Sequence, residues 1–235
     1  TMDVTHSDIA IKLQRTEQIR DLAMVKDRLQ RMALITTAAY GFSYGLGLDV
    51  EITKEIGFST PPFIFGTPHE EIAFENSLGE MERYWRLISE SPEINPHSRS
   101  MRIALINYMR AIRDPEEAMM FCYRAIEAVR DSPSFTSNVP TDHISTWNNL
   151  RTTLRLGEFE DYLKPLVDLA TPHRHGEQMI PSHKEYIAGL KTTRTVIQRY
   201  AEYLNNEETA LSPTRFPKLT QSEFNGSGPS GTQGG

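Results

Sequence analysis

The chain has 235 residues, a formal net charge of −6 and an apolar content of 38%. This length is enough for one large or two small domains with hydrophobic cores. With 31 acidic and 25 basic residues, the chain as a whole is not expected to bind nucleic acid through a broad positive surface. A local basic patch is still compatible with this composition. No apolar run approaches about 20 residues, so we expect no segment that spans a membrane.

The cysteine content and the first residues of the chain indicate the cellular compartment of the protein. Cys122, the single cysteine, cannot form an internal disulfide, and it lies in an apolar run. We therefore expect a buried thiol in a reducing compartment. The first residues, TMDVTHSDIAIKLQ, are polar and lack the apolar core of a signal peptide. Together these features predict a cytoplasmic protein.

The first half is predicted to combine helices with a small β element. Apolar residues recur at spacings of three and four over residues 8–40, which is typical of an amphipathic helix. Residues 48–53 then alternate apolar with polar or charged side chains, and consecutive prolines follow, so a strand is favoured and helix is excluded. We place the β element near residues 44–66. A second helix is expected over 68–90, where a threonine, a proline and two glutamates form a start signal.

The second half is predicted to be a bundle of helices. Start signals such as Asp114-Pro115-Glu116-Glu117 and periodic apolar residues indicate helices over 98–112, 115–131, 141–156, 158–170 and 181–205. The last 24 residues are rich in Gly, Ser, Thr and Pro and show no hydrophobic period, so we expect them to be disordered. The predicted fold class is mainly α, with an N-terminal helix-plus-β region over 1–95, a bundle over 96–211 and a disordered tail over 212–235.

A polar stretch between the last two predicted helices, LVDLATPHRHGEQMIPSH, holds the first candidate site. His173, His175 and Glu177 form an H-x-H-x-E spacing, and His183 could add a fourth ligand. Imidazole and carboxylate groups bind zinc or iron, so one hypothesis is a metal-dependent hydrolase. Pro172 and a following glycine favour instead an irregular loop without a metal.

Three segments of the second half resemble the HEPN superfamily of helical bundles, most of all its ApeA-like branch. They read FCYRAIEAVRD, YLKPLVDLATPHRHGE and HKEYIAGLKTTRTVIQRYAEYL, and the resemblance covers about residues 100–205. In that family an early helix carries an aromatic-x-x-Ala-Ile-Glu pattern, and a later one reads apolar-x-x-Leu-Arg-Asn-x-x-x-His-Gly. The resemblance implies a bundle that pairs as a homodimer and, in many members, a metal-independent ribonuclease whose arginine and histidine act on RNA.

The resemblance assigns roles to particular residues and also departs from the family pattern. His175 and Gly176 match the terminal His-Gly, but the arginine position falls on Ala170. Arg174 is adjacent to His175 and cannot occupy the same place on a helix. The candidate catalytic residues are thus His175 and Arg174. Arg124 and Glu127, on the early helix, match better and are the candidate ligand-binding residues; they also suit a plain surface row of ion pairs.

Three hypotheses follow for the function. The first is a degenerate HEPN-like module that binds a partner, a nucleotide or RNA, in a defence or stress system. The second is an active metal-independent endoribonuclease that uses His175, and the third is the metal-dependent hydrolase. We expect no cofactor under the first two hypotheses. A homodimer is predicted to pack through the bundle, with three aromatic side chains as exposed anchors: Tyr108, Trp147 and Tyr162.

Overall fold

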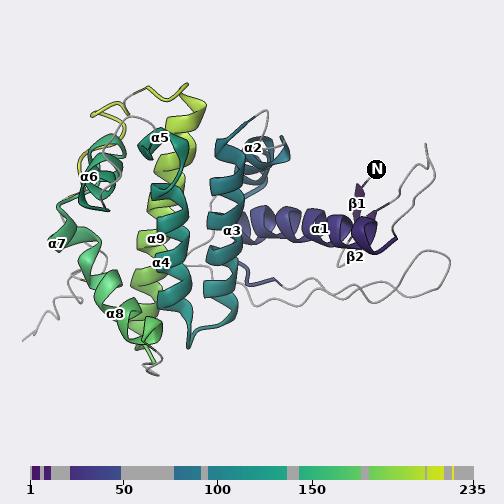
Figure 1. The fold of residues 1–235 in the computed structure, drawn as a ribbon, viewed down its shortest axis with the longest axis horizontal. Helices are drawn as coiled ribbons and strands as arrows, with labels where there is room; N and C mark the ends of the chain where they lie inside the picture. Colours follow the sequence, from purple (N-terminus) through teal and green to yellow (C-terminus); the bar gives the residue numbers. More distant parts are fainter. Residues whose placement is uncertain are drawn as a thin grey trace, which may run out of the picture.

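A computed structural model describes residues 2–5, 8–11, 22–48, 77–90, 95–136, 143–175, 180–209, 211–219 and 224. In these residues the chain is mainly helical, which confirms the predicted fold class (Figure 1). The strands are β1 (Met2–Thr5) and β2 (Asp8–Ile11). The helices are α1 (Leu22–Tyr44), α2 (Ser77–Ser89), α3 (His97–Arg113), α4 (Ala118–Arg130), α5 (Pro133–Thr136), α6 (His143–Thr153), α7 (Phe159–Tyr162), α8 (Lys164–Arg174) and α9 (His183–Asn205).

The β structure differs from the prediction. β1 and β2 form an antiparallel pair in which Met2 lies opposite Ile11 and Val4 opposite Ile9. The helix predicted to begin at residue 8 is wrong for residues 8–11, which form β2. Ile9 and Ile11 fit the period of two of a strand as well as the period of a helix. Most of the β element predicted near 44–66 lies outside the described residues. Of its first residues, Tyr44 ends α1, Gly45 forms a turn and Leu46 makes a β bridge.

Helices α3, α4 and α9 run side by side and form the centre of the bundle (Figure 1). α8 packs on α4, while α1 crosses α3 at a steep angle and α2 lies against both. None of the described helices is long and apolar enough to cross a bilayer. The α3–α4 pair is therefore central to the fold, and part of its surface is left uncovered by the other described helices.

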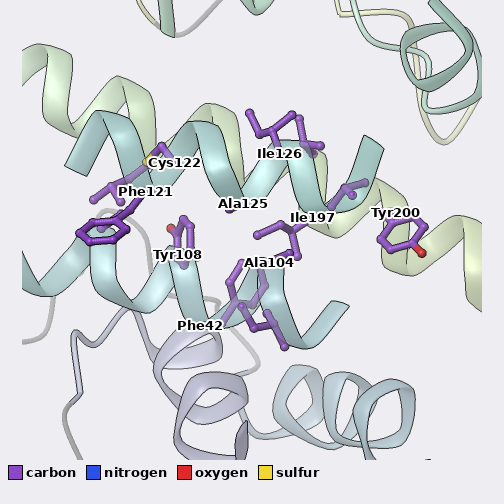
Figure 2. Close-up of a cluster of buried hydrophobic side chains, with 14 of the residues drawn as sticks. Phe42, Ala104, Tyr108, Phe121, Cys122, Ala125, Ile126, Ile197 and Tyr200 are labelled. Atoms are coloured by element: carbon purple, nitrogen blue, oxygen red, sulfur yellow. The ribbon is translucent and has the colours of Figure 1, made fainter. Parts of the chain in front are cut away.

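One hydrophobic core joins the N-terminal helices to the bundle. The Phe42 ring of α1 lies 4.7 Å from that of Tyr84 in α2 and 4.9 Å from that of Tyr108 in α3. Figure 2 shows Phe42 and Tyr108 in the same cluster as Cys122 and Ile197. This core crosses the predicted boundary at residues 95/96, so the described parts of the two predicted regions pack as one unit.

The thiol of Cys122 is a core group, as predicted. Cys122 is fully buried and forms no disulfide. Burial raises the pKa of this thiol to about 12, while a hydrogen bond with Thr193 acts in the opposite direction. A thiol with so high a pKa is protonated near neutrality and is a poor nucleophile. Cys122 therefore contributes packing rather than covalent chemistry.

The residues after α9 return to the bundle. Leu211 is buried at 3% exposure, and Phe216 and Leu219 pack partly buried against the core. We call residues 211–219 the C-terminal strap. Residues 212–219, the first part of the tail predicted to be disordered, form a turn and a short coil without any hydrophobic period, and a few apolar anchors and backbone hydrogen bonds hold them. Except for Phe224, the later residues of that predicted tail lie outside the described part of the chain.

A close approach of two backbones at Gly47 gives a first prediction. A Cβ added there would lie 2.7 Å from the backbone nitrogen of Arg113 and 2.8 Å from its Cα. We expect Gly47→Ala to lower the free energy of unfolding by about 1–3 kcal/mol, because backbone must move. Gly189→Ala is the control, since its Cβ would meet the movable tip of Met119 and the substitution also favours helix. Thermal melts that rank the two variants in the reverse order would contradict this expectation.

Candidate functional site

The predicted catalytic histidine lies at the end of a helix. His175 is exposed and directly follows α8, and its backbone N–H donates to the carbonyl oxygen of Pro172 at 2.9 Å. Arg174 is the last residue of α8. Figure 1 places this end of α8 at the end of the bundle where α9 begins. The position leaves the imidazole of His175 accessible to solvent.

The loop expected after residue 170 begins later than predicted. Residues 171–174 continue α8, with Pro172 inside the helix. A proline there removes the backbone donor of one i→i−4 hydrogen bond and crowds the preceding turn, and α8 ends two residues after it. The Thr171 hydroxyl donates to the carbonyl oxygen of Val167 at 2.7 Å, one turn earlier. His173 and Arg174 thus belong to a helical turn rather than to an irregular loop.

The metal hypothesis gains no site from the described residues. His173 lies in the last turn of α8, partly buried, and His183 is the exposed first residue of α9. Among the described residues no group of three His, Cys, Asp or Glu side chains could hold a metal ion. Glu177, the carboxylate of the H-x-H-x-E spacing, lies outside them.

The start of α9 is capped by its own side chains. The Ser182 hydroxyl accepts from the backbone N–H of Glu185 at 3.3 Å, and the Glu185 carboxylate accepts from the N–H of Ser182 at 2.8 Å. These hydrogen bonds lower the pKa of Glu185. A carboxylate therefore occupies the positive end of the helix dipole close to His175 in sequence. The capping box therefore opposes an anionic ligand at this terminus.

Arg124 and Glu127 lie on α4 in different surroundings. Arg124 is exposed, whereas Glu127 is half-buried, and its carboxylate lies 3.6 Å from the guanidinium of Arg130. The C-terminal end of α4, near Glu127, lies beside α5 and away from the end of α8 (Figure 1). The structure thus places Glu127 and His175 toward opposite ends of α4. Of the two candidate ligand-binding residues, Arg124 is the one available to a ligand.

Charge on α3 and α4 is strongly one-sided. The two helices carry six arginines and one glutamate, in a chain with a net charge of −6. Three of the arginines have partners: Arg102 the backbone carbonyls of Ile88 and Glu90, Arg113 the neighbouring Asp114, and Arg130 the neighbouring Asp131. The other three are exposed and form no ion pair with a described residue: Arg99, Arg110 and Arg124.

These three exposed arginines, which lack an ion-pair partner among the described residues, are named the arginine face. On α3, Arg99, Ile103, Ile106 and Arg110 are spaced by four, three and four residues, so they follow one side of the helix. The Arg110 guanidinium lies 5.9 Å from the ring centroid of Phe121 on α4. Arg124 comes three residues after Phe121, which makes them neighbours on the helix surface. Arg110 thus lies over a ring at the α3–α4 seam, and Arg124 follows that ring by about one turn of α4.

The predicted dimer anchors are buried inside the chain. Tyr108 is 0% exposed, Trp147 5% and Tyr162 2%. Their rings fill the space between helices, and Trp147 also lies beneath the guanidinium of Arg130 at 4.9 Å. The expectation that these three side chains are exposed is wrong. Sequence periodicity identifies them as apolar anchors but does not tell whether the partner is another helix of the same chain.

Comparison with known proteins gives one family. The family described as domain of unknown function (DUF8168), C-terminal domain, matches residues 88–205, half of the chain. The chain belongs to this family. The DUF8168 C-terminal domain runs from the end of α2 to the last residue of α9, so it contains the arginine face and excludes the strap. No curated protein and no solved structure matches the chain.

The arginine face was missed in the sequence, although a signal was present. Residues 97–113 of the DUF8168 C-terminal domain contain four arginines and no acidic residue. The net charge of the whole chain hides this, because the acidic residues lie elsewhere, three of them in the connection 114–117. A charge count for each predicted helix, rather than for the chain, would have indicated the face.

Proposed function

We propose that the DUF8168 C-terminal domain of this chain is a HEPN-like helical module that binds RNA through the arginine face without cleaving it. The observation that carries the proposal is the set of exposed arginines on α3 and α4 that form no ion pair with a described residue: Arg99, Arg110 and Arg124. Guanidinium groups bind phosphate through two parallel hydrogen bonds. The carboxylate of Glu127, the one acidic group on these helices, is held by Arg130 and offers little repulsion.

The extent of the face favours a polymer over a single nucleotide. Arg99 and Arg110 are eleven residues apart, which corresponds to about 16 Å along a helix. One nucleotide cannot reach both ends, whereas successive phosphates of a strand can. Ile103, 41% exposed between them, offers an apolar contact to a base or ribose. The HEPN resemblance favours RNA over DNA.

The position of Ala170 supports a binding rather than a catalytic role. The resemblance places the catalytic arginine at Ala170, which is fully buried and carries no polar group. His175 is accessible, but the capping box puts the Glu185 carboxylate at the helix terminus that follows it. A phosphate in the transition state needs positive charge beside the histidine. The endoribonuclease that uses His175 and Arg174 remains the alternative hypothesis.

The setting of this function is part of the proposal. A cytoplasmic location suits RNA as a ligand and a buried, unpaired Cys122. The HEPN resemblance further favours a homodimer and a role in a defence or stress system. Since the predicted aromatic anchors are buried, such a dimer needs another contact.

Binding and cleavage of a labelled single-stranded RNA test the proposal. We expect the full chain to bind a 20-nucleotide RNA in fluorescence anisotropy, with the logarithm of the binding constant falling against that of salt with a slope of about −2, as for three phosphate contacts. The RNA should stay intact with and without a chelator. Salt-independent binding, or none, would refute the proposal. Cleavage lost in His175→Ala would establish the endoribonuclease instead, and cleavage lost with chelator the metal-dependent hydrolase. A parallel titration with a DNA of the same sequence shows whether binding depends on the ribose 2′-hydroxyl.

A further inference from the structure

The strap is held mainly through its backbone. The Arg155 Nε donates to the carbonyl oxygen of Phe216 at 2.7 Å, and the backbone N–H of Leu219 donates to the carbonyl oxygen of Arg155 at 3.2 Å. Arg199, on α9, donates to the carbonyl oxygen of Pro217 at 2.9 Å. Such contacts recognise residues 216–219 by their main chain, as main-chain hydrogen bonds do when a peptide is recognised at a sheet edge.

The receiving surface is shaped for close approach. A Cβ added at Gly157 would lie 2.4 Å from the carbonyl oxygen of Leu219, so only glycine lets the strap lie this close. Next to it the Lys218 ammonium lies 2.6 Å from the Glu158 carboxylate. Arg199 is 6% exposed and also donates to the carbonyls of Leu154 and Arg155, which fixes its guanidinium in place. We call this surface, residues 154–158 with Arg199, the strap groove.

The connection between α9 and the strap is strained. Glu207 and Glu208 have φ angles of 52° and 56°, a left-handed conformation that costs free energy for any residue except glycine. The turn is held by the Glu208 carboxylate, 2.9 Å from Nε2 of His97, and by the Glu208 N–H, which donates to the carbonyl oxygen of Tyr203 at 3.0 Å. An extended connection would relieve the strain at both residues.

We propose that the strap groove also receives the strap of a second copy of this chain, so that two chains exchange straps and form a dimer. Every strap–groove contact described above is identical in the exchanged form, since the same residues meet. The two forms then differ at the hinge, residues 206–209, which bends back in the monomer and opens in the dimer. Relief of the left-handed turn favours exchange, and loss of the His97–Glu208 pair and of translational freedom oppose it. The inference supplies a contact for the homodimer proposed above and does not depend on RNA.

Strap exchange can be tested with two full-length variants. In each of them the strap cannot bind the groove of its own chain. Gly157→Val blocks the groove, and Leu219→Pro removes the N–H that bonds Arg155. Neither variant alone contains a working strap–groove pair, so each should be monomeric by light scattering. A mixture contains one working pair, the Leu219→Pro groove with the Gly157→Val strap, and should yield a 1:1 heterodimer. Circular dichroism of each variant checks that the helices remain.

A hinge variant supplies an independent readout. Glu207→Gly tolerates the positive φ, so it should raise the dissociation constant of the parent dimer by about tenfold. Glu207→Ala is the matched control, because it removes the same carboxylate and keeps the strain. A mixture that stays monomeric would overturn strap exchange, and so would dimers of either variant alone. Equal dissociation constants for the glycine and alanine variants would overturn the role of the hinge.

Discussion

Replacing Arg110 and Arg124 together by glutamate should weaken RNA binding by about a hundredfold or more. Each of these arginines is expected to make a charge-assisted hydrogen bond to phosphate, and such bonds contribute about 1.5–3 kcal/mol. Two of them therefore account for at least two factors of ten in the dissociation constant. The slope of binding against salt should also become shallower, because fewer counterions are released. Anisotropy titrations at four salt concentrations measure both effects.

A control variant should change the charge of the chain by the same amount outside the arginine face. A double replacement of Arg83 and Arg86 by glutamate is unsuitable, because Arg83 is paired with Glu202 at 2.9 Å. Arg86→Glu alone is suitable, since Arg86 is exposed on α2 and lies outside the arginine face. It should be compared with Arg124→Glu alone, which makes the same change in net charge. If both single variants weaken binding equally, the ligand responds to the charge of the whole chain and the arginine face is not the binding surface.

Ending the chain after residue 210 should lower the melting temperature by about 10 °C. The truncation removes the buried side chain of Leu211 and the half-buried side chains of Phe216 and Leu219. Their burial stabilises the fold by about 3–5 kcal/mol, and each kcal/mol shifts the melting temperature of a chain of this size by about 2–4 °C. The truncation also removes the Pro217 carbonyl oxygen, which accepts a hydrogen bond from the Arg199 guanidinium. Burial lowers the pKa of this guanidinium, because burial disfavours its charged form.

A second truncation, after Phe224, is the matched control. It keeps the strap and Phe224, which packs partly buried against the core. It removes none of the contacts described above, so we expect a change of about 1 °C or less. Differential scanning calorimetry measures both proteins. Equal melting temperatures for the parent and the shorter truncation would mean that the strap contributes no stability.

The helices of the bundle could be predicted closely from local signals. Residues 98–112 and 181–205 were predicted as helices, and the structure has α3 over His97–Arg113 and α9 over His183–Asn205. At α9 the signal was the capping pair of Ser182 and Glu185. Such signals act within one turn, so a single sequence suffices to read them.

The features that the sequence did not predict depend on distant partners. The strap lacks any period because its order comes from Arg155 and Arg199, which are far from it in the chain. The burial of Tyr108 depends on Phe42, on a helix of the first half. Pro172 signals the end of a helix locally, and α8 continues for two more residues. For the candidate site, Arg124 was identified, whereas its grouping with Arg110 required the packing of α3 on α4.

The six arginines and one glutamate of α3 and α4 give these two helices a local positive charge in spite of the acidic total of the chain. A polyanion approaching from afar meets a particle with a charge of −6 and is repelled. At physiological ionic strength this repulsion is screened beyond about 8 Å, and within that distance the local charge of α3 and α4 dominates. Under the proposed RNA-binding function, this local charge would turn an incoming strand toward α3 and α4 before any contact forms. The orientation of the strand would then be selected during the encounter rather than after it.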